Sequence, residues 1–563
     1  MWIGLNDMII CHTENDGKLH LRWREDGIRK ETTIEDFEPY FFVSANSDEP
    51  AFYQINMNIE GRRVSLEMPY KYEHGDWKNL YGKPLKKVII SRSSDIYKAR
   101  KHWSKTYEAD VPFHYRYCVD KLSELKEYNL RKWYWDMEWL NDDPNEGDSI
   151  TAIVVYDNYD DEYTVLTWNP YLNEDKFPEY NNNSKIVTFH SEFEMLRAFM
   201  KQIQHRDPDM LISWFGSKFD LPKLIHRLHY RGIDARGLSP YNEVKGVGYN
   251  EITDKVDNYS PVAQPIRGRI TLDLDLAFER QWNDSQRGTL PSLALDYVSE
   301  TVLGAKKLVS EKFPDKNEFF KRGWLEDTKN YLEYARVDVE LLYRIDEEMG
   351  LSEGILALQR LLIAPFDACF YASNMGSIYF MRNADWKAPT GDKSKMREDY
   401  DGALIYDPME EGTNGLHLGV AAFDYAGLYP SMMLARNISW ETMSPSKTEF
   451  GVNLKTPRDF SPVTERSMVY FKTDKLGLLP RSVLELKTLR DEYKRRRNEA
   501  KNKREYTKWE NSQMAVKRLM ASFYGIIGYQ GFGWANVTLA AAITASAREA
   551  IREAAFIVRG LDG

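Results

Sequence analysis

The chain contains little cysteine and no long apolar run. Its cysteines stand far apart and form neither a disulfide framework nor a CxxC metal site, so we expect buried thiols at Cys11, Cys118 and Cys369. No apolar stretch approaches the roughly 20 residues that a membrane-spanning helix needs. The first residues also lack the basic, apolar and small-residue zones of a secretory signal. These absences predict a cytoplasmic protein with no membrane role.

An excess of positive charge is also missing. The formal net charge is -10, whereas proteins neutralise nucleic-acid phosphates with lysine and arginine. The sum does not exclude that role, because metal-binding acids and outer-surface acids lower it while a basic cleft can still hold a duplex. With 563 residues, 42% hydrophobic and 13% aromatic, the chain has enough material for several cores. Its length predicts about three to five domains.

Changes in pattern divide the chain into parts. Residues 1–130 alternate in short segments such as LHLRWRE, which predicts a mostly β domain to which the helical residues 345–398 return. Residues 131–344 alternate strands with helices, which predicts an α/β domain with NEDKFPEYNNNSK as a surface loop. The remaining parts are residues 399–475, with GLHLGVAAFDYAGLYPSMM as a buried strand, turn and helix; a helical hairpin in 476–530, bent near Asn502; and an alanine-rich helix in 531–563. The predicted fold is multidomain, α/β and α+β.

Two acids in KWYWDMEWL are the first candidate site residues. Asp136 and Glu138 are two apart in a strand-like run, so their side chains point to the same face. Such a pair alone is more often a solvated strand edge. Here it is set among Trp133, Trp135 and Trp139, where unpaired carboxylates are costly unless a cation meets them.

Further acids follow at positions that suit the same site. Asp220 comes after a strand and a glycine-containing turn in DPDMLISWFGSKFDLPKL. Tyr334 and Asp338 are four apart on a predicted helix and share one face, although Asp338 alone is better explained as an exposed helix acid. Together these groups form a set of hard oxygen ligands suited to two Mg²⁺ ions, with Mn²⁺ as an alternative.

The order and spacing of these elements resemble the three exonuclease motifs of family B DNA polymerases of the archaeal type. The resemblance implies an RNase H-like 3′–5′ exonuclease domain in residues 131–344, with Tyr334 orienting the attacking water. The metal ligands that it implies are Asp136, Glu138, Asp220 and Asp338. One departure is Phe215, where the family usually has Asn. This change affects the expected grip on the single-stranded primer end, which an aromatic face could replace by stacking on a base.

The segment GVAAFDYAGLYPSMM resembles motif A of the same family. The resemblance implies that Asp424 binds both catalytic metals and that the backbone of Tyr425, Gly427 and Leu428 approaches the triphosphate. Tyr429 would be the steric gate, a ring that leaves no room for a 2′-hydroxyl group. Upstream, YDGALIYDP resembles the family's YxGG/A element, which holds the template, here through Tyr400 and Gly402.

The segments LRDEYK and AVKRLMASFYGIIGY lie in the predicted hairpin. Without further context, a basic solvated helix pair explains them equally well. They resemble the fingers and motif B, which implies that Arg490, Lys494 and Lys517 hold the incoming dNTP triphosphate. Tyr524 and Gly525 would pack against the nascent base pair. Ala521 stands where the family often has Asn, which implies weakened or rerouted contacts to the triphosphate.

The third polymerase motif of the family, an Asp-Thr-Asp hairpin called motif C, is not present in the sequence. A lone Asp424 cannot clamp two ions. We therefore expect a small second polypeptide, the carboxy-terminal polymerase subunit, to supply motif C and the thumb. Strand addition by this partner would cover the open edge of a partial palm.

The leading hypothesis is a DNA-directed DNA polymerase large subunit with 3′–5′ proofreading. Its expected partners are primer-template DNA, dNTPs, the small subunit and a sliding clamp. The first alternative is a polymerase-derived exonuclease whose palm only binds DNA, against which Asp424, Tyr429 and the three cations argue. A non-catalytic DNA-binding scaffold is the second alternative, and the exonuclease acids argue against it.

Overall fold

The structure is a computed structural model in which two compact units are described. The residues described are 10–13, 17–59, 62–140, 149–169, 183–244, 249–250, 255–256, 264–284, 288–392, 399–405, 414–455 and 467–561. Unit 1 comprises Met1–Glu35, Leu122–Phe370 and Asn502–Asn511, and unit 2 comprises Asp36–Lys121, Tyr371–Lys501 and Ser512–Gly563. Most of the predicted NEDKFPEYNNNSK loop lies outside the described residues.

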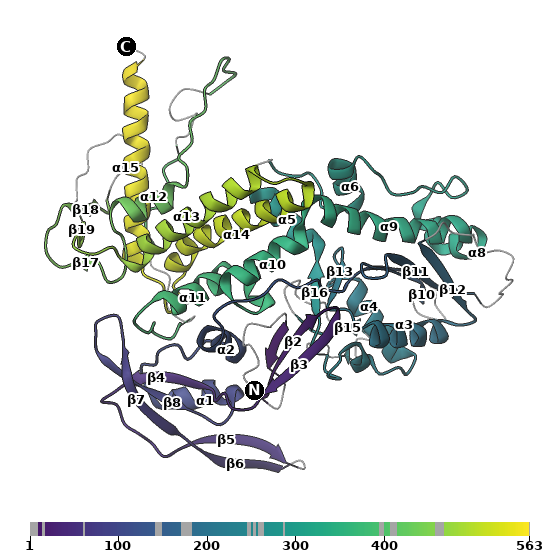
Figure 1. Ribbon diagram of the computed structural model, residues 1–563, viewed down its shortest axis with the longest axis horizontal. Coiled ribbons are helices and arrows are strands. Elements are labelled where there is room, and N and C mark those ends of the chain that lie inside the picture. Colours follow the sequence, from purple (N-terminus) through teal and green to yellow (C-terminus); the bar gives the residue numbers. More distant parts are fainter. Residues whose placement is uncertain are drawn as a thin grey trace. The chain divides into compact units, whose positions relative to one another are not determined.

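Unit 1 is built on a mixed six-stranded sheet of order β12-β11-β10-β9-β13-β16 (Figure 1). The strands β9, β13 and β16 are parallel to one another, while β10 is antiparallel to both β9 and β11. The strand bounds are β9 Lys132–Trp139, β10 Ile150–Asp157, β11 Glu162–Trp168, β12 Ser184–Phe189, β13 Met210–Ser213 and β16 Ile270–Asp273. A smaller sheet contains β1 Ile10–Thr13, β2 Leu19–Glu25 and β3 Ile28–Ile34, and β14 Tyr249–Asn250 pairs with β15 Lys255–Val256. The predicted α/β layout of this region is confirmed.

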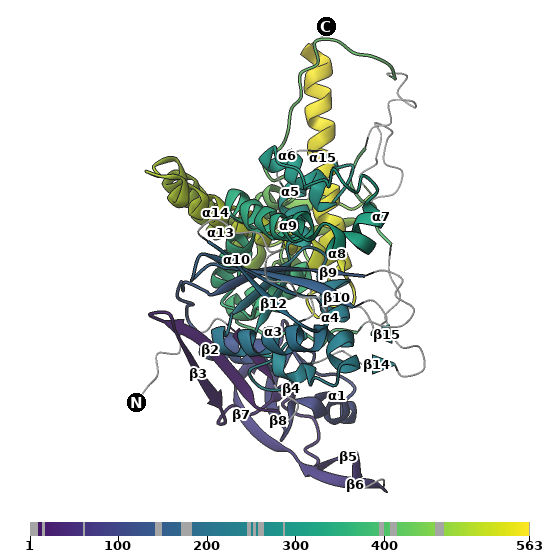
Figure 2. The same ribbon diagram turned by 90° about the vertical axis from the view of Figure 1, so that its right-hand side faces the viewer.

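Helices cover both faces of the sheet, as Figure 2 shows for α9 on one side and α3 and α4 on the other. Helix α3 begins after Ser191, whose side chain accepts the Glu194 N–H, and α9 ends at Gly350 with a left-handed φ of 63°. The helix bounds are α3 Glu192–Arg206, α4 Asp220–Tyr230, α5 Leu274–Asp284, α6 Leu295–Leu303, α7 Lys316–Glu318, α8 Trp324–Glu326, α9 Thr328–Met349 and α10 Leu351–Leu362. A π-helical turn, Phe319–Gly323, lies between α7 and α8.

Alternation along β9 separates the core from the polar face. Trp133, Trp135 and Met137 are buried in the apolar core together with side chains of α3 and α4. The intervening side chains face α9, as the hydrogen bond from Tyr134 to Asp346 shows. Because side chains in a strand alternate between faces, Asp136 is directed to the same side as Tyr134.

Unit 2 combines β-hairpins with long helices. Its strands are β4 Tyr40–Ser44, β5 Phe52–Ile59, β6 Arg62–Pro69, β7 Lys71–Lys78, β8 Pro84–Ile89, β17 Met443–Ser444, β18 Phe450–Asn453 and β19 Met468–Phe471. Its helices are α1 Ile96–Ala99, α2 Phe113–Lys121, α11 Ala372–Asn383, α12 Leu428–Ala435, α13 Leu478–Asn498 and α15 Val537–Leu561, and α14 Lys503–Gly528 contributes to both units. The strands β4 to β8 confirm a β-rich amino-terminal region.

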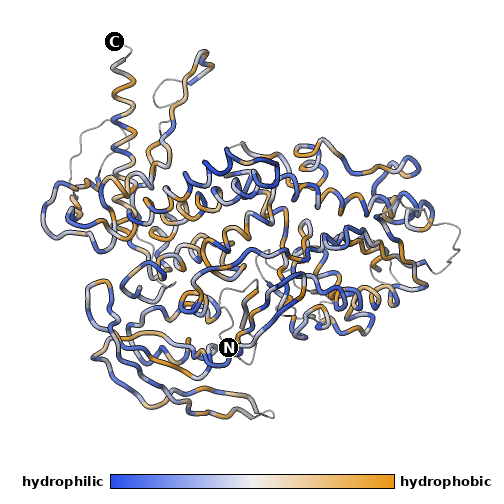
Figure 3. Tube along the Cα trace, in the orientation of Figure 1, coloured by the Kyte–Doolittle hydropathy of each residue, from blue (hydrophilic) through white to orange (hydrophobic). Residues whose placement is uncertain are grey.

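The predicted hairpin and alanine-rich helix are confirmed as α13, α14 and α15. The hydrophilic colouring around the connection of α13 to α14 in Figure 3 reflects the charged sequence KRRRNEAKNKRE. Among the described residues, no helix is both long enough and apolar enough to cross a membrane.

The predicted buried strand before α12 is wrong. Residues 414–427 form no strand, and Leu416, Leu418 and Val420 are 90%, 88% and 73% exposed. A strand needs a neighbour to pair its backbone groups, and no described part of unit 2 pairs with this segment. The turn and the helix that follow it are formed as predicted, since Gly427 precedes α12 in a left-handed conformation with φ 71°.

Candidate active sites

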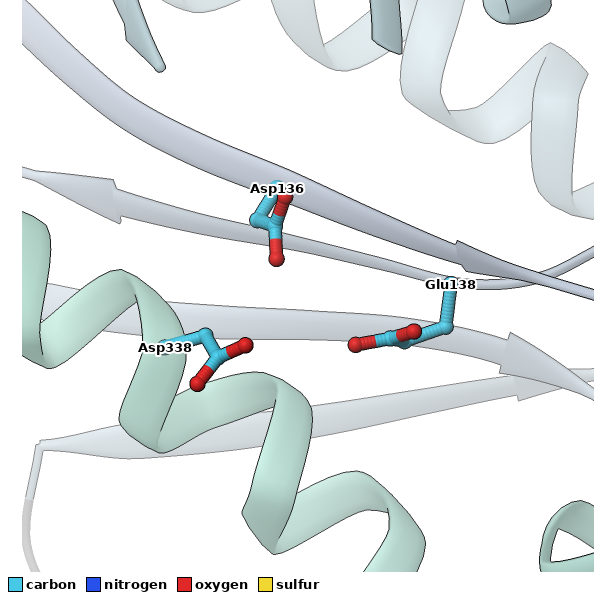
Figure 4. Close-up of side chains that lie close together, drawn as sticks. All are labelled: Asp136, Glu138 and Asp338. Atoms are coloured by element: carbon cyan, nitrogen blue, oxygen red, sulfur yellow. The ribbon is translucent and has the colours of Figure 1, made fainter. Parts of the chain in front are cut away.

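Three predicted metal ligands meet between β9 and α9 (Figure 4). Asp136 and Glu138 come from β9 and Asp338 from α9, and one carboxylate oxygen of each lies within 4.8 Å of the others. This convergence follows from local geometry, because residues two apart in a strand share the face on which α9 packs. The structure therefore brings together acids that are about 200 residues apart in the chain.

Asp220 joins this group from α4, of which it is the first residue. It is 3% exposed, and after burial the charge of Asp136 is the largest influence that raises its pKa, so the two carboxyl groups interact. The four acids thus form one continuous cluster.

Electrostatics in this cluster favour a bound cation. Burial raises the pKa of Asp136, of Glu138 and of Asp220, and the neighbouring acids raise the last two further. Burial also raises the pKa of Asp338, to about 7. Within the part of the chain that the structure describes, Asp338 Oδ1 has no hydrogen-bond partner. These oxygens are the hard ligands that Mg²⁺ and Mn²⁺ prefer, so the residues fit divalent ions.

Lys307 supplies a positive charge that the sequence analysis missed. Its Nζ donates to Asp338 Oδ2 at 2.5 Å and lies 3.3 Å from the Tyr334 hydroxyl. Burial alone would lower the pKa of Lys307, but attraction to Asp338 raises it. A lysine in an irregular segment between α6 and α9 carries no local signal, and only the folded contact identifies it.

Tyr334 is held within the same cluster. Edge-on contacts place the rings of Phe319 and Phe320 with centroids 5.7 Å and 5.6 Å from the Tyr334 ring. Burial, followed by Asp338, raises the pKa of the Tyr334 hydroxyl, which keeps its proton for hydrogen bonding. The predicted Phe215 lies in the turn before Asp220, and the Lys218 Nζ lies 5.4 Å from its ring centroid.

The predicted residues of the second site lie in unit 2. Asp424 is exposed in the segment before α12 and belongs to no group of three or more metal-ligand side chains found among the described residues. Tyr425 donates from its hydroxyl to the Ala550 carbonyl at 3.1 Å. The rings of Tyr429 and Tyr524 pack with centroids 4.6 Å apart, which brings the predicted motifs A and B together.

The Tyr400 segment is fastened to the same region. The hydroxyl groups of Tyr400 and Tyr524 lie 3.0 Å apart. Arg548 of α15, which the sequence analysis missed, is fully buried and donates to the carbonyl oxygens of Asp401 at 2.8 Å and Gly402 at 2.7 Å. An arginine in an alanine-rich helix gives no sign of this role until the helix is placed.

The predicted triphosphate cations lie on α13 and α14. Arg490 Nε donates to Gln513 Oε1 at 3.0 Å, which links the two helices, and Lys494 Nζ lies 3.9 Å from Asp491. Lys517 and Gly525 are on α14, and a Cβ placed on Gly525 would meet open space. The hairpin thus carries the three cations on the helices that were predicted for them.

Comparison with known families separates the same two regions. Residues 122–298 match the family "DNA polymerase family B, exonuclease domain", and residues 377–561 match "DNA polymerase family B". The first match contains β9 and Asp220, and the second contains Asp424 and the α13–α14 hairpin. The chain belongs to DNA polymerase family B.

Individual members of family B resemble the chain over most of its length. It is 26% identical to a DNA polymerase of Pyrococcus glycovorans and 25% identical to DNA polymerase 1 of Pyrococcus abyssi, over 95% of this chain in both cases. The chain spans 66% of the length of each relative. The solved structure of a family B polymerase from Pyrobaculum calidifontis superimposes with a TM-score of 0.69 at 16% identity, covering 98% of this chain and 71% of that one.

The acid cluster of this family B chain predicts a pH-dependent stability. An unfolded aspartate has a pKa of about 3.9, whereas that of folded Asp338 is about 7. A raised folded pKa gives stability that is present below about pH 4 and lost as pH rises through about 7. We therefore expect Asp338→Asn to raise the metal-free unfolding temperature at pH 8, by about 2–4 °C per kcal/mol recovered, and to reduce the further rise that Mg²⁺ produces.

Asp346→Asn is the matched control, because Asp346 is also buried on α9 but accepts hydrogen bonds from Tyr134 and Ser352. This control should lower the unfolding temperature and keep the Mg²⁺-induced rise. Thermal unfolding with and without Mg²⁺ measures both effects. A metal-free Asp338→Asn protein that is less stable than the wild type at pH 8 would contradict the claim that the charged Asp338 carboxylate destabilises the metal-free fold.

Proposed function

We propose that the cluster in unit 1 is a 3′–5′ exonuclease centre that removes nucleotides from a DNA 3′ end. The observation that carries this proposal is the convergence of Asp136, Glu138 and Asp338, with the buried Asp220 close enough for the charge of Asp136 to raise its pKa. These four acids would hold two Mg²⁺ ions, or Mn²⁺ in their place. Such ions supply an activated water and stabilise charge on the leaving 3′ oxygen.

The remaining side chains of the centre have roles that their contacts suggest. Tyr334 keeps its hydroxyl proton and would orient the attacking water. Lys307, already bonded to Asp338, would offset negative charge that develops on the phosphate oxygens. Phe215 would stack on a base at the single-stranded end in place of the usual amide contact.

We further propose that unit 2 carries the polymerase site, so that the protein is a DNA-directed DNA polymerase with proofreading. Tyr429 packed on Tyr524 supports this reading, because one ring would line the sugar and the other the nascent base pair. The proposed dNTP contacts are Tyr425, Gly427, Leu428, Arg490, Lys494, Lys517 and Tyr524. The proposed DNA contacts besides Phe215 are Tyr400, Gly402 and Gly525, and a sliding clamp is a proposed processivity partner.

Completion of this polymerase site requires a second carboxylate for Asp424. The exposed apolar residues Leu416, Leu418 and Val420 alternate along the segment before it, as one face of a strand would. We propose that strands of a small partner polypeptide pair here and bring motif C and the thumb. The domain roles proposed with it are exonuclease for 131–344, palm for 399–475 and 531–563, and fingers for 476–530.

A second candidate function is an exonuclease whose palm only binds DNA. The exposure of Asp424, without companion acids among the residues described, favours it. The test compares two variants. If Asp136 variants lose degradation and Asp424 variants lose extension, the polymerase with proofreading is supported over the exonuclease whose palm only binds DNA. If extension survives the loss of Asp424, the proposed metal role of Asp424 is wrong. If the purified chain extends a primer by itself, the proposed partner polypeptide is not needed.

The steric gate gives a separate prediction. Tyr429→Val removes the ring that would abut C2′ of the sugar. Since one methylene group in a pocket is worth about 10–200-fold, this change should reduce discrimination against ribonucleotides by at least about 10-fold. Tyr429→Phe keeps the ring and should retain discrimination. The measurement is the ratio of kcat/KM for dNTP and rNTP with the assembled complex. Equal ratios in the wild-type and Tyr429→Val proteins would show that Tyr429 is not the steric gate.

A further inference from the structure

The turn that delivers Asp220 has a demanding backbone. Phe215 has a left-handed φ of 56°, in a backbone region that residues other than glycine rarely adopt. At the next residue, a Cβ on Gly216 would lie 1.8 Å from Ser213 Oγ, so no other amino acid fits there without rearrangement. Backbone of this kind persists when surrounding contacts over-determine it.

Those contacts come from Asp273, the last residue of the neighbouring strand β16, and from Asp275 in the first turn of α5. Strand β16 pairs in parallel with β13, with Asp273 opposite Ser213, so its end lies beside the turn that follows β13. Asp273 Oδ1 accepts the Ser217 N–H at 3.1 Å and the Ser217 hydroxyl at 2.9 Å. Asp275 Oδ1 accepts the Phe215 N–H at 3.0 Å. The two carboxylates thus accept three hydrogen bonds from one short turn.

Both acids are kept in unfavourable surroundings. Asp273 is 2% and Asp275 7% exposed, and Asp273 Oδ2 has no hydrogen-bond partner within the described ranges. Burial, and after it the charge of Asp275, raise the pKa of Asp273 to about 7 against the opposing effect of the Ser217 hydrogen bonds. Hydrogen bonds from backbone N–H groups to a charged acceptor are stronger than those to a neutral one. The charged carboxylates of Asp273 and Asp275 therefore hold the turn more firmly than neutral side chains would.

We propose that Asp273 and Asp275 are positioning residues for the exonuclease centre. They fix the 215–219 turn so that Asp220 at its end reaches Asp136 and completes the ion site. Neither acid contacts a reacting atom in this assignment. The inference rests on the proposed exonuclease function and extends it from the ion ligands to the turn that aims one of them.

Asp273→Asn tests the assignment with Mg²⁺ alone as the first probe. The Mg²⁺ concentration that gives half of the maximal rise in unfolding temperature should increase about 10–100-fold, as for other residues that orient metal ligands. In the exonuclease assay, kcat at subsaturating Mg²⁺ should fall by a similar factor. The KM for single-stranded DNA should change less than kcat, because Asp273 bonds Ser217, whereas the proposed DNA contact Phe215 is held by Asp275.

Asp157→Asn is the control for loss of a buried acid in the same sheet. Asp157 bonds Arg131 and Trp133, and we expect this variant to keep the wild-type Mg²⁺ midpoint. If Asp273→Asn does not fold, Ser217→Ala decides, since it removes only the hydroxyl donor and should still shift the midpoint about threefold or more. An unchanged midpoint in the folded variant overturns the positioning role while wild-type degradation stands. A wild-type protein that does not degrade DNA overturns the exonuclease function itself.

Discussion

Asp136→Ala is expected to lower the rate of nucleotide removal from a DNA 3′ end by about a thousandfold or more. Asp136 interacts electrostatically with Asp220 and stands two residues from Glu138, so its removal disturbs the ligands of both proposed ions. Loss of a metal that contributes several kcal/mol of charge stabilisation corresponds to a rate loss of this order, since about 1.4 kcal/mol is a factor of ten. The measurement is single-turnover release from a labelled single strand.

Two comparisons keep this result specific. Glu162→Ala removes an acid from β11 of the same sheet and should leave degradation unchanged. Primer extension by the chain with its proposed partner should persist in the Asp136→Ala protein, because the proposed polymerase residues lie in unit 2. Degradation at the wild-type rate would show that the cluster is not the nuclease centre.

Asp424→Ala should have the reverse effect. If Asp424 holds both ions of the polymerase site, its loss should lower extension by about a thousandfold or more, for the same reason of lost charge stabilisation. Degradation by the cluster in unit 1 should continue. The assay is extension of a labelled primer with dNTPs by the chain together with its partner, with nuclease activity removed by Asp136→Ala.

Asp474→Ala provides a matched exposed acid of unit 2 and should extend normally. Because Asp424 is exposed, its substitution should leave the unfolding temperature nearly unchanged, which separates a catalytic defect from a folding defect. Extension at an undiminished rate in the Asp424→Ala protein would refute the metal role of Asp424.

The exonuclease cluster could be predicted because two local spacings and a resemblance to known motifs pointed to the same acids. The spacing of Asp136 and Glu138 fixes a shared strand face, and that of Tyr334 and Asp338 fixes a shared helix face. The helical hairpin was equally accessible, because a long run of good helix formers without internal proline or glycine leaves few other conformations. These features are determined by residues that are close together in the sequence.

Contacts between distant segments were not accessible in this way. Lys307 is 31 residues from Asp338 and sits in an irregular segment, so no periodicity marks it. Asp273 lies 56 residues from Ser217 and is identified by the pairing of β16 with β13. The strand predicted before Asp424 failed for a related reason, since an apolar run forms a strand only where another strand receives it.

The ammonium group of Lys307 has a consequence for how the protein is made. It already neutralises part of the carboxylate cluster, so a newly synthesised chain has a cation of its own before any ion arrives. Small zinc domains, in contrast, remain unfolded until they capture their metal. We therefore expect unit 1 to fold where free magnesium is scarce. Removal of ions with a chelator should silence the proposed nuclease centre reversibly and leave the architecture in place.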